Sequence, residues 1–157
     1  MKENIELINK FYTAFQNKDY ATMQNFYAKN AVFNDAVFTN LNSAQVKAMW
    51  EMLIKNGKDL KLEFNNVKAN ENAGSANWTA HYTFSGTGKK VTNNIKANFV
   101  FENGKIVNHK DHFSFYAWAK QSLGTTGLLL GWTPFLKNKV KQQAMKNLEK
   151  FMQANKS

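Results

Sequence analysis

The chain has 157 residues, of which 43% are hydrophobic, so it is long and apolar enough to fold as one domain and is not a disordered tail. It has no cysteine, which excludes disulfides and thiolate chemistry, and it has no apolar run long enough to span a bilayer. The net charge is +10, but every basic residue is a lysine and the lysines are spread along the chain. A nucleic-acid partner is therefore disfavoured, because arginine is the residue that binds phosphates and guanine edges bidentately.

The first part of the chain carries helix signals interrupted by one strand signal. Apolar residues at spacings of three and four predict a helix over 3–17, followed by a short helix over 20–28. The β-branched and aromatic run 31–38 predicts a strand. A third helix is expected between an N-cap at Ser43 and Gly57. The start of the chain lacks the apolar centre of a signal peptide, so the cytoplasm is the expected location.

From residue 59 the apolar period changes to two, which indicates strands. We expect them over 59–69, 76–84, 91–101 and 105–116, with a tight hairpin at the Asn-Gly pair in 102–105. Three helices followed by a four-stranded antiparallel meander predict an α+β fold, with the helices packed on one face of a curved sheet.

The tail is different in character. The segment 122–135 is apolar and punctuated by glycine, and a helix is expected over 134–154, where proline occupies the first helical position. We therefore divide the chain into a domain over 1–121 and a C-terminal extension over 122–157 that packs on the same domain.

Two titratable residues lie close together in an aromatic stretch of the last predicted strand. His109 and Asp111 alternate with outward residues and lie roughly 6.6 Å apart, so both can address one small ligand. Val107 and Phe113 are expected on the same face. The alternatives are a strand edge in water, a hydrogen-bonded core histidine, or a β-bulge that exchanges the two faces.

Asp35 is the second candidate, because a carboxylate in an apolar strand is desolvated and its pKa rises, which favours general acid or base catalysis near neutral pH. The alternative is an Asx turn that ends the strand. No spacing typical of a metal site, phosphate loop or nucleophilic triad is found, so neither a metal nor a cofactor is expected.

Most aromatic residues fit a core, and a few are expected to line a cavity within it. The expected cavity residues are Tyr12, Phe15, Trp50, Tyr82, Phe113 and Trp118.

With these residues in view, the chain resembles the nuclear transport factor 2-like superfamily, in particular its SnoaL-like and ketosteroid isomerase-like bacterial members. The opening FYTAFQNKDYATMQNFYAKNAVFNDAVF and the last hairpin FVFENGKIVNHKDHFSFYAW carry the resemblance, which covers residues 3–118. It implies a curved sheet wrapped around helices as a cone with an apolar pocket, and often a homodimer formed through the sheet.

The resemblance also implies roles for particular residues. Asp35 matches the general base of the isomerase, but Phe11, next to Tyr12, and Ala97 stand where its oxyanion hole needs a tyrosine and a neutral aspartate, which disfavours steroid isomerisation. His109 and Asp111 match the His and Asp that cyclase-like members place in the pocket. The subgroup's last strand often ends in a carboxylate, and Ser114 replaces it here.

These observations leave two classes of function open. One is an isomerase, cyclase or hydratase that transfers protons on an apolar small molecule through Asp35, His109 and Asp111. The other is a non-catalytic binding or assembly module. A homodimer is expected through the outer face around Thr79 and His81, which is small and uncharged for an exposed strand.

The apolar run 123–132 includes three consecutive leucines and Trp132, and in water it would form an exposed patch. We expect it to fold back as a lid over the mouth of the cone. The alternative is peripheral membrane attachment, with neighbouring lysines facing anionic lipid.

Overall fold

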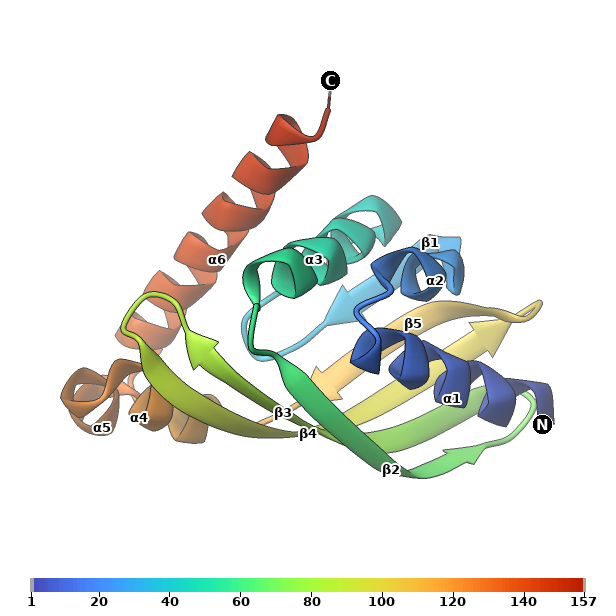
Figure 1. Ribbon diagram of the computed structural model, residues 1–157, viewed down its shortest axis with the longest axis horizontal. Helices are drawn as coiled ribbons and strands as arrows, with labels where there is room; N and C mark the ends of the chain where they lie inside the picture. Colours follow the sequence, from blue (N-terminus) through green and yellow to red (C-terminus); the bar gives the residue numbers. More distant parts are fainter. Residues whose placement is uncertain (1, 157) are drawn as a thin grey trace.

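The computed structural model describes residues 2–156 and shows the predicted α+β fold. A curved five-stranded sheet in the order β1-β5-β4-β3-β2 wraps around α1, α2 and α3 (Figure 1). The strands are β1 (Tyr27–Asn34), β2 (Lys61–Ala69), β3 (Ala73–Phe84), β4 (Lys89–Glu102) and β5 (Lys105–His112). The helices are α1 (Lys2–Gln16), α2 (Tyr20–Asn25), α3 (Ser43–Asn56), α4 (Phe115–Leu123), α5 (Thr125–Leu130) and α6 (Pro134–Ala154).

The sheet contains the predicted meander and one additional pairing. Strands β2 to β5 are antiparallel neighbours, and β1 adds a fifth strand parallel to β5. Asn103 and Gly104 have φ values of 51° and 73°, the positive values that a tight turn between two twisted strands requires, so the predicted hairpin is confirmed.

The core lies between the inner face of the sheet and α1 and α3. Alternate residues of β4 are buried from Val91 to Phe101, which is the period-two pattern of a strand with one wet face. Helix α1 buries Ile8, Phe11 and Tyr12 against them.

Several predicted boundaries are corrected. The first strand runs from residue 27 to 34 instead of 31 to 38, so Asp35 follows the strand, and the second helix ends at Asn25. The N-cap of α3 is Asn42 instead of Ser43, because Asn42 and Gln45 form a reciprocal capping box.

The last strand is shorter than predicted. It ends at His112, and Ser114 caps α4 by accepting a hydrogen bond from the Ala117 N–H. Phe115 and Trp118 therefore belong to a helix whose buried stripe follows a spacing of three, and the alternation of Phe113 and Phe115 only imitated a strand.

Helices α4 and α5 lie at one end of the molecule, and α6 runs from that end along the side of α3 to the C-terminus (Figure 1). Helix α6 has the predicted proline in its first turn, is capped by Thr133, and packs on α3, with Leu148 buried in the core. Helix α5 was not predicted, and its leucines are exposed. The expectation that 123–132 covers the cone is therefore wrong for residues 128–132, and α4 is the element buried at that end. No helix within residues 2–156 is long and apolar enough to cross a membrane.

Candidate functional site

His109 lies on the inner face of β5, fully buried among aromatic rings. Its ring centre is 4.3 Å from that of Phe99 and 4.9 Å from that of Phe33. A β-bulge at Val107 sets this orientation, because β4 Val100 pairs with Asn108 while the next residue, Phe101, pairs with Ile106. Ile106, and not Val107 as predicted, is therefore the buried residue before His109.

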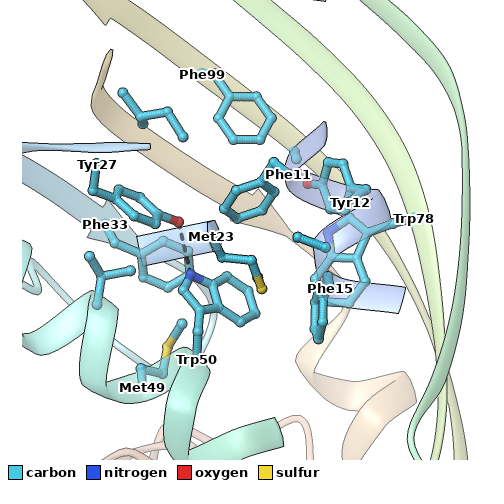
Figure 2. Packing of buried hydrophobic residues seen from close by; sticks show 14 of the residues in the cluster. Phe11, Tyr12, Phe15, Met23, Tyr27, Phe33, Met49, Trp50, Trp78 and Phe99 are labelled. Atoms are coloured by element: carbon cyan, nitrogen blue, oxygen red, sulfur yellow. Dashed lines mark hydrogen bonds between the residues drawn. The ribbon is translucent and has the colours of Figure 1, made fainter. Parts of the chain in front are cut away.

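Two hydrogen bonds connect α3 to β5 through the buried Tyr27, and a third joins two residues of β5. The Trp50 Nε1–H donates to the Tyr27 hydroxyl at 2.8 Å (Figure 2), and that hydroxyl lies 2.8 Å from His109 Nδ1. His109 Nε2 lies 2.9 Å from Asp111 Oδ1. Since the indole can only donate, the Tyr27 proton is free to go to Nδ1, which leaves the histidine proton on Nε2, directed at the carboxylate.

Asp35 occupies the turn that follows β1. The sequence left open whether it is a desolvated carboxylate suited to acid or base catalysis, or the first residue of an Asx turn. Its Oδ1 accepts hydrogen bonds from the backbone N–H groups of Val37 at 2.7 Å and Phe38 at 2.6 Å, which is an Asx turn. Burial nevertheless raises the pKa of the Asp35 carboxyl to about 6, in spite of these two bonds, which lower it. The Asx turn is therefore confirmed, and the expected rise of the pKa accompanies it, while the catalytic role of Asp35 stays a prediction.

The charges of the three predicted catalytic residues act on one another. The Asp111 carboxylate raises the pKa of Asp35 further and His109 lowers it. Burial raises the pKa of the Tyr12 hydroxyl, with a further contribution from Asp111. Burial likewise raises the pKa of Tyr82, against a lowering hydrogen bond from Trp118 and with a contribution from Asp35. Asp35, His109 and Asp111 thus share one electrostatic environment with two tyrosines.

Helix α4 covers this environment from the end of the sheet. The Trp118 Nε1–H donates to the Tyr82 hydroxyl at 2.8 Å, and Trp118 and Phe115 pack in a small buried cluster that Tyr82 and Val37 also contact. Tyr82, Val37 and Phe113 contact the main core as well. The seam between the two clusters therefore lies beside Asp35.

The six predicted cavity residues divide into two groups. Tyr12, Phe15 and Trp50 are buried in a filled core, where rings pack edge to face and stacked (Figure 2). Tyr82, Phe113 and Trp118 lie at the seam. Two surface hollows, of about 430 and 620 Å³, are lined by residues near Asn25 and by α6, and neither of these two includes Asp35, His109 or Asp111.

Two buried polar atoms in this core have no protein partner. Among residues 2–156, the Tyr12 hydroxyl and the Trp78 Nε1–H form no hydrogen bond, and their rings are 6.0 Å apart. A buried donor without an acceptor destabilises the fold, so both atoms are candidates to bind a ligand oxygen.

The position expected for an oxyanion aspartate is Ala97 on β4, which is fully buried. In the sheet register Ala97 lies directly opposite Asp111. The Asp111 carboxyl on β5 is therefore the neighbour, across the sheet, of the β4 position at which the resemblance implies an aspartate.

Tyr27 was not among the predicted site residues, because the predicted short helix ran to residue 28 and included it. The one sequence feature that could have indicated Tyr27 is its position as an aromatic residue directly before the alternating residues of β1. Within the described residues, no three His, Cys, Asp or Glu side chains gather as metal ligands would.

Comparison with known proteins places the chain in a family. The profile of the SnoaL-like domain matches residues 8–109, more than half of the chain. No curated protein matches it. AclR from Streptomyces galilaeus is 24% identical with a TM-score of 0.62, over 72% of this chain and 90% of that one.

Two further solved structures share the fold. An LEH-like epoxide hydrolase of M. tuberculosis is 19% identical with a TM-score of 0.62, over 87% of this chain and 96% of its own. TerC, crystallised with polyporic acid, is 16% identical with a TM-score of 0.64, over 76% of this chain and 97% of its own. Together with the match over residues 8–109, these likenesses show that the chain belongs to the SnoaL-like domain family, with the nuclear transport factor 2-like fold.

Proposed function

We propose that the protein is a cofactor-independent enzyme that moves protons on an apolar small molecule bearing a carbonyl group, with Asp35 as general acid and base. The observation that carries this proposal is the desolvated Asp35 carboxyl, held by two backbone N–H groups in one electrostatic environment with the buried His109–Asp111 pair; burial raises the pKa of Asp35 to about 6. A carboxyl with such a pKa is ionised often enough at neutral pH to accept a proton and holds it well enough to return it.

The Asp35 carboxylate would take a proton from the carbon next to the carbonyl, which leaves the negative charge on the carbonyl oxygen. The Tyr82 hydroxyl is the proposed donor to that oxygen, because it lies at the seam, accepts from Trp118 without spending its own proton, and has a pKa that burial and Asp35 both raise. Return of the proton to a different carbon would complete an isomerisation, and attack of the anion on a second carbonyl would complete a cyclisation.

In this proposal His109 and Asp111 orient one another and supply a fixed charge near Asp35. The Nε2–H of His109 fixes one oxygen of Asp111, and Tyr27 and Trp50 fix His109 in turn. Burial is the main cause of the raised pKa of Asp35, and the fixed Asp111 carboxylate adds a smaller contribution in the same direction. We regard His109 and Asp111 as positioning residues until a ligand is seen to touch them.

A substrate would enter at the seam between the two buried clusters, because the cone itself is filled with rings. Entry requires α4 to move away from Tyr82. The polar contacts that hold α4 there are the bond from Trp118 to Tyr82, the bond from Thr87 to the Ser122 carbonyl, and bonds between Gln121 and Thr92. The apolar packing of Trp118 against Val91 and Phe84 would also have to open.

A non-catalytic binding or assembly module is the second candidate, and the filled core favours it. The fully buried rings of Phe11, Phe33 and Phe99 occupy the space where a related enzyme would need room. In that case the Tyr27–His109–Asp111 connections would serve only to satisfy buried polar groups.

A ligand screen by thermal shift separates the two candidates. The probes are polyporic acid, the compound crystallised with TerC, and apolar cyclic ketones such as β-tetralone. We expect a probe to raise the melting temperature of the wild type, and we expect Asp35→Asn and Asp111→Asn to change that response while Asp59→Asn, on an exposed turn, does not. Equal responses in all four proteins would favour the binding module.

A further inference from the structure

The segment from α5 to the start of α6 exposes a row of large apolar side chains. Of the seven large hydrophobic residues exposed in residues 2–156, five belong to this segment, and Trp132 is the most exposed at 74%. The other four are Leu128, Leu129, Leu130 and Phe135. We call these five residues the tail patch.

The packing of α5 on α4 holds the tail patch outward. A Cβ at Gly127 would lie 1.8 Å from the Ala119 carbonyl oxygen, so only glycine permits this approach. Gly127 and Gly131 are buried in this turn, whereas the three leucines of α5 are exposed. The apolar side of α5 is thus on the outside because its smallest residues are needed on the inside.

Hydrogen bonds fix the patch in this arrangement. The Tyr116 hydroxyl donates to the Leu128 carbonyl at 3.1 Å, and the Trp132 Nε1–H donates to the Leu129 carbonyl at 2.9 Å. The indole therefore has its polar atom satisfied while its ring remains in solvent. Figure 1 shows α5 at an extremity of the molecule, where a flat surface can reach it.

The surroundings of the patch are positive. The chain contains no Asp or Glu from His112 to Leu148, and this stretch holds five lysines at 120, 137, 139, 141 and 146. The Lys139 Nζ lies 5.2 Å from the Phe135 ring centre, and the Lys120 Nζ lies 5.0 Å from that of Tyr116. The ammonium groups therefore border the apolar residues directly.

We propose that the tail patch docks the protein peripherally on membranes that contain anionic lipid. Leucine, tryptophan and phenylalanine side chains enter the interface, and the lysines meet the headgroups. A second copy of the chain is a poorer occupant, because two tail patches face to face would bring lysines together without a carboxylate between them.

Co-sedimentation of the full chain with vesicles tests this proposal. The vesicles are phosphatidylcholine alone and phosphatidylcholine mixed with phosphatidylglycerol. We expect binding to the mixed vesicles that falls as salt rises, together with a blue shift of tryptophan fluorescence. That shift reports Trp132, because Trp50, Trp78 and Trp118 are buried.

Matched variants identify the contacts. Trp132→Ser should weaken binding to mixed vesicles by at least about ten-fold, while Leu53→Ser, an exposed apolar residue on α3, should leave it unchanged. Lys137→Gln with Lys139→Gln should weaken it by about 25-fold, at roughly five-fold for each lysine near the surface. Lys96→Gln with Lys110→Gln removes the same charge from the outer face of the sheet and should have a much smaller effect.

Three results would overturn the proposal. The first is a wild-type chain that does not bind mixed vesicles. The second is binding that Trp132→Ser retains in full. The third is self-association that Trp132→Ser abolishes, without vesicle binding by the wild type, which would assign the patch to a second copy of the chain.

Discussion

The His109 Nε2 lies 2.9 Å from the Asp111 Oδ1, in a part of the core from which water is excluded. The two residues are separated by one outward-facing lysine on β5, so the strand itself places both side chains on the inner face. Tyr27 completes the arrangement by bonding the other ring nitrogen. The first prediction concerns this connection.

Replacing Tyr27 with Phe should destabilise the fold by roughly 2–5 kcal/mol, because two buried groups, the Trp50 Nε1–H and the His109 Nδ1, each lose a partner. Urea unfolding followed by circular dichroism gives the free energy of unfolding. Tyr82→Phe is the matched control, since Tyr82 also accepts from a tryptophan but is only partly buried. Its cost should be about 1 kcal/mol. An equal loss of unfolding free energy in the two variants would show that the hydrogen bonds of Tyr27 stabilise the fold no more than the partly buried bond of Tyr82.

Replacing Asp35 with Asn should make the fold more stable above pH 6. The pKa of Asp35 is raised from the ordinary value of 3.8 to about 6 in the folded chain, so the protonated carboxyl is favoured by folding. This contribution is present below pH 3.8 and is lost as the pH rises through 6, which costs up to about 3 kcal/mol at neutral pH.

Asparagine cannot ionise and keeps an oxygen for the turn, so the variant should gain about 1–3 kcal/mol at pH 8 and little at pH 4. Thermal unfolding across this range measures the difference. Destabilisation of Asp35→Asn at every pH would mean that the Asx turn alone accounts for the residue.

Replacing Trp118 with Ala should lower the pKa of Asp35 toward its ordinary value, because removal of the indole admits water to the seam. A carbon-detected NMR titration of the aspartate carboxyls measures it, with Asp35→Asn to assign the signal. Phe135→Ala, an exposed aromatic in the same tail, is the control and should leave the titration unchanged. An unaltered pKa in Trp118→Ala would show that α4 does not shield the carboxyl.

The outer face of the sheet should form a homodimer. Its side chains are tied to one another, with Thr79 donating to Asn94 at 2.9 Å and His81 Nε2 lying 2.7 Å from Glu63 Oε1, so the face is preformed. Sedimentation equilibrium should give twice the 18.0 kDa of one chain. Thr79→Lys should dissociate the dimer by placing like charges across it, whereas Thr39→Lys, in an exposed loop, should not. A single-chain mass for the wild type at micromolar concentration would contradict the expectation.

Most of the fold could be predicted because apolar periodicity and cap residues act locally. The strands from residue 59 to 112 and helix α6 follow directly from such patterns. The end of β5 could not be predicted, because Phe113 and Phe115 continue an alternation that the Ser114 cap interrupts. Over so few residues, the same apolar positions fit both a strand that alternates with a period of two and the first turn of a helix.

The candidate site shows the same limit. Asp35, His109 and Asp111 could be selected as polar residues in apolar surroundings, but Tyr27 could not, because its role depends on the pairing of β1 with β5 across 82 positions of sequence. The outward position of the leucines in α5 was also beyond the sequence, since it results from the close approach of Gly127 to Ala119.

Catalysed exchange of hydrogen for deuterium tests the proposed function most directly, because it requires only the first proton transfer and not the natural substrate. β-Tetralone and related apolar cyclic ketones are incubated with the protein in deuterium oxide, and mass spectrometry follows the label at the carbon next to the carbonyl. The account predicts exchange above the buffer rate that Asp35→Asn lowers by about 10²–10⁴-fold and Asp59→Asn leaves unchanged. Exchange that is equally fast with Asp35→Asn, or no exchange above buffer with any ketone of the panel, would contradict it.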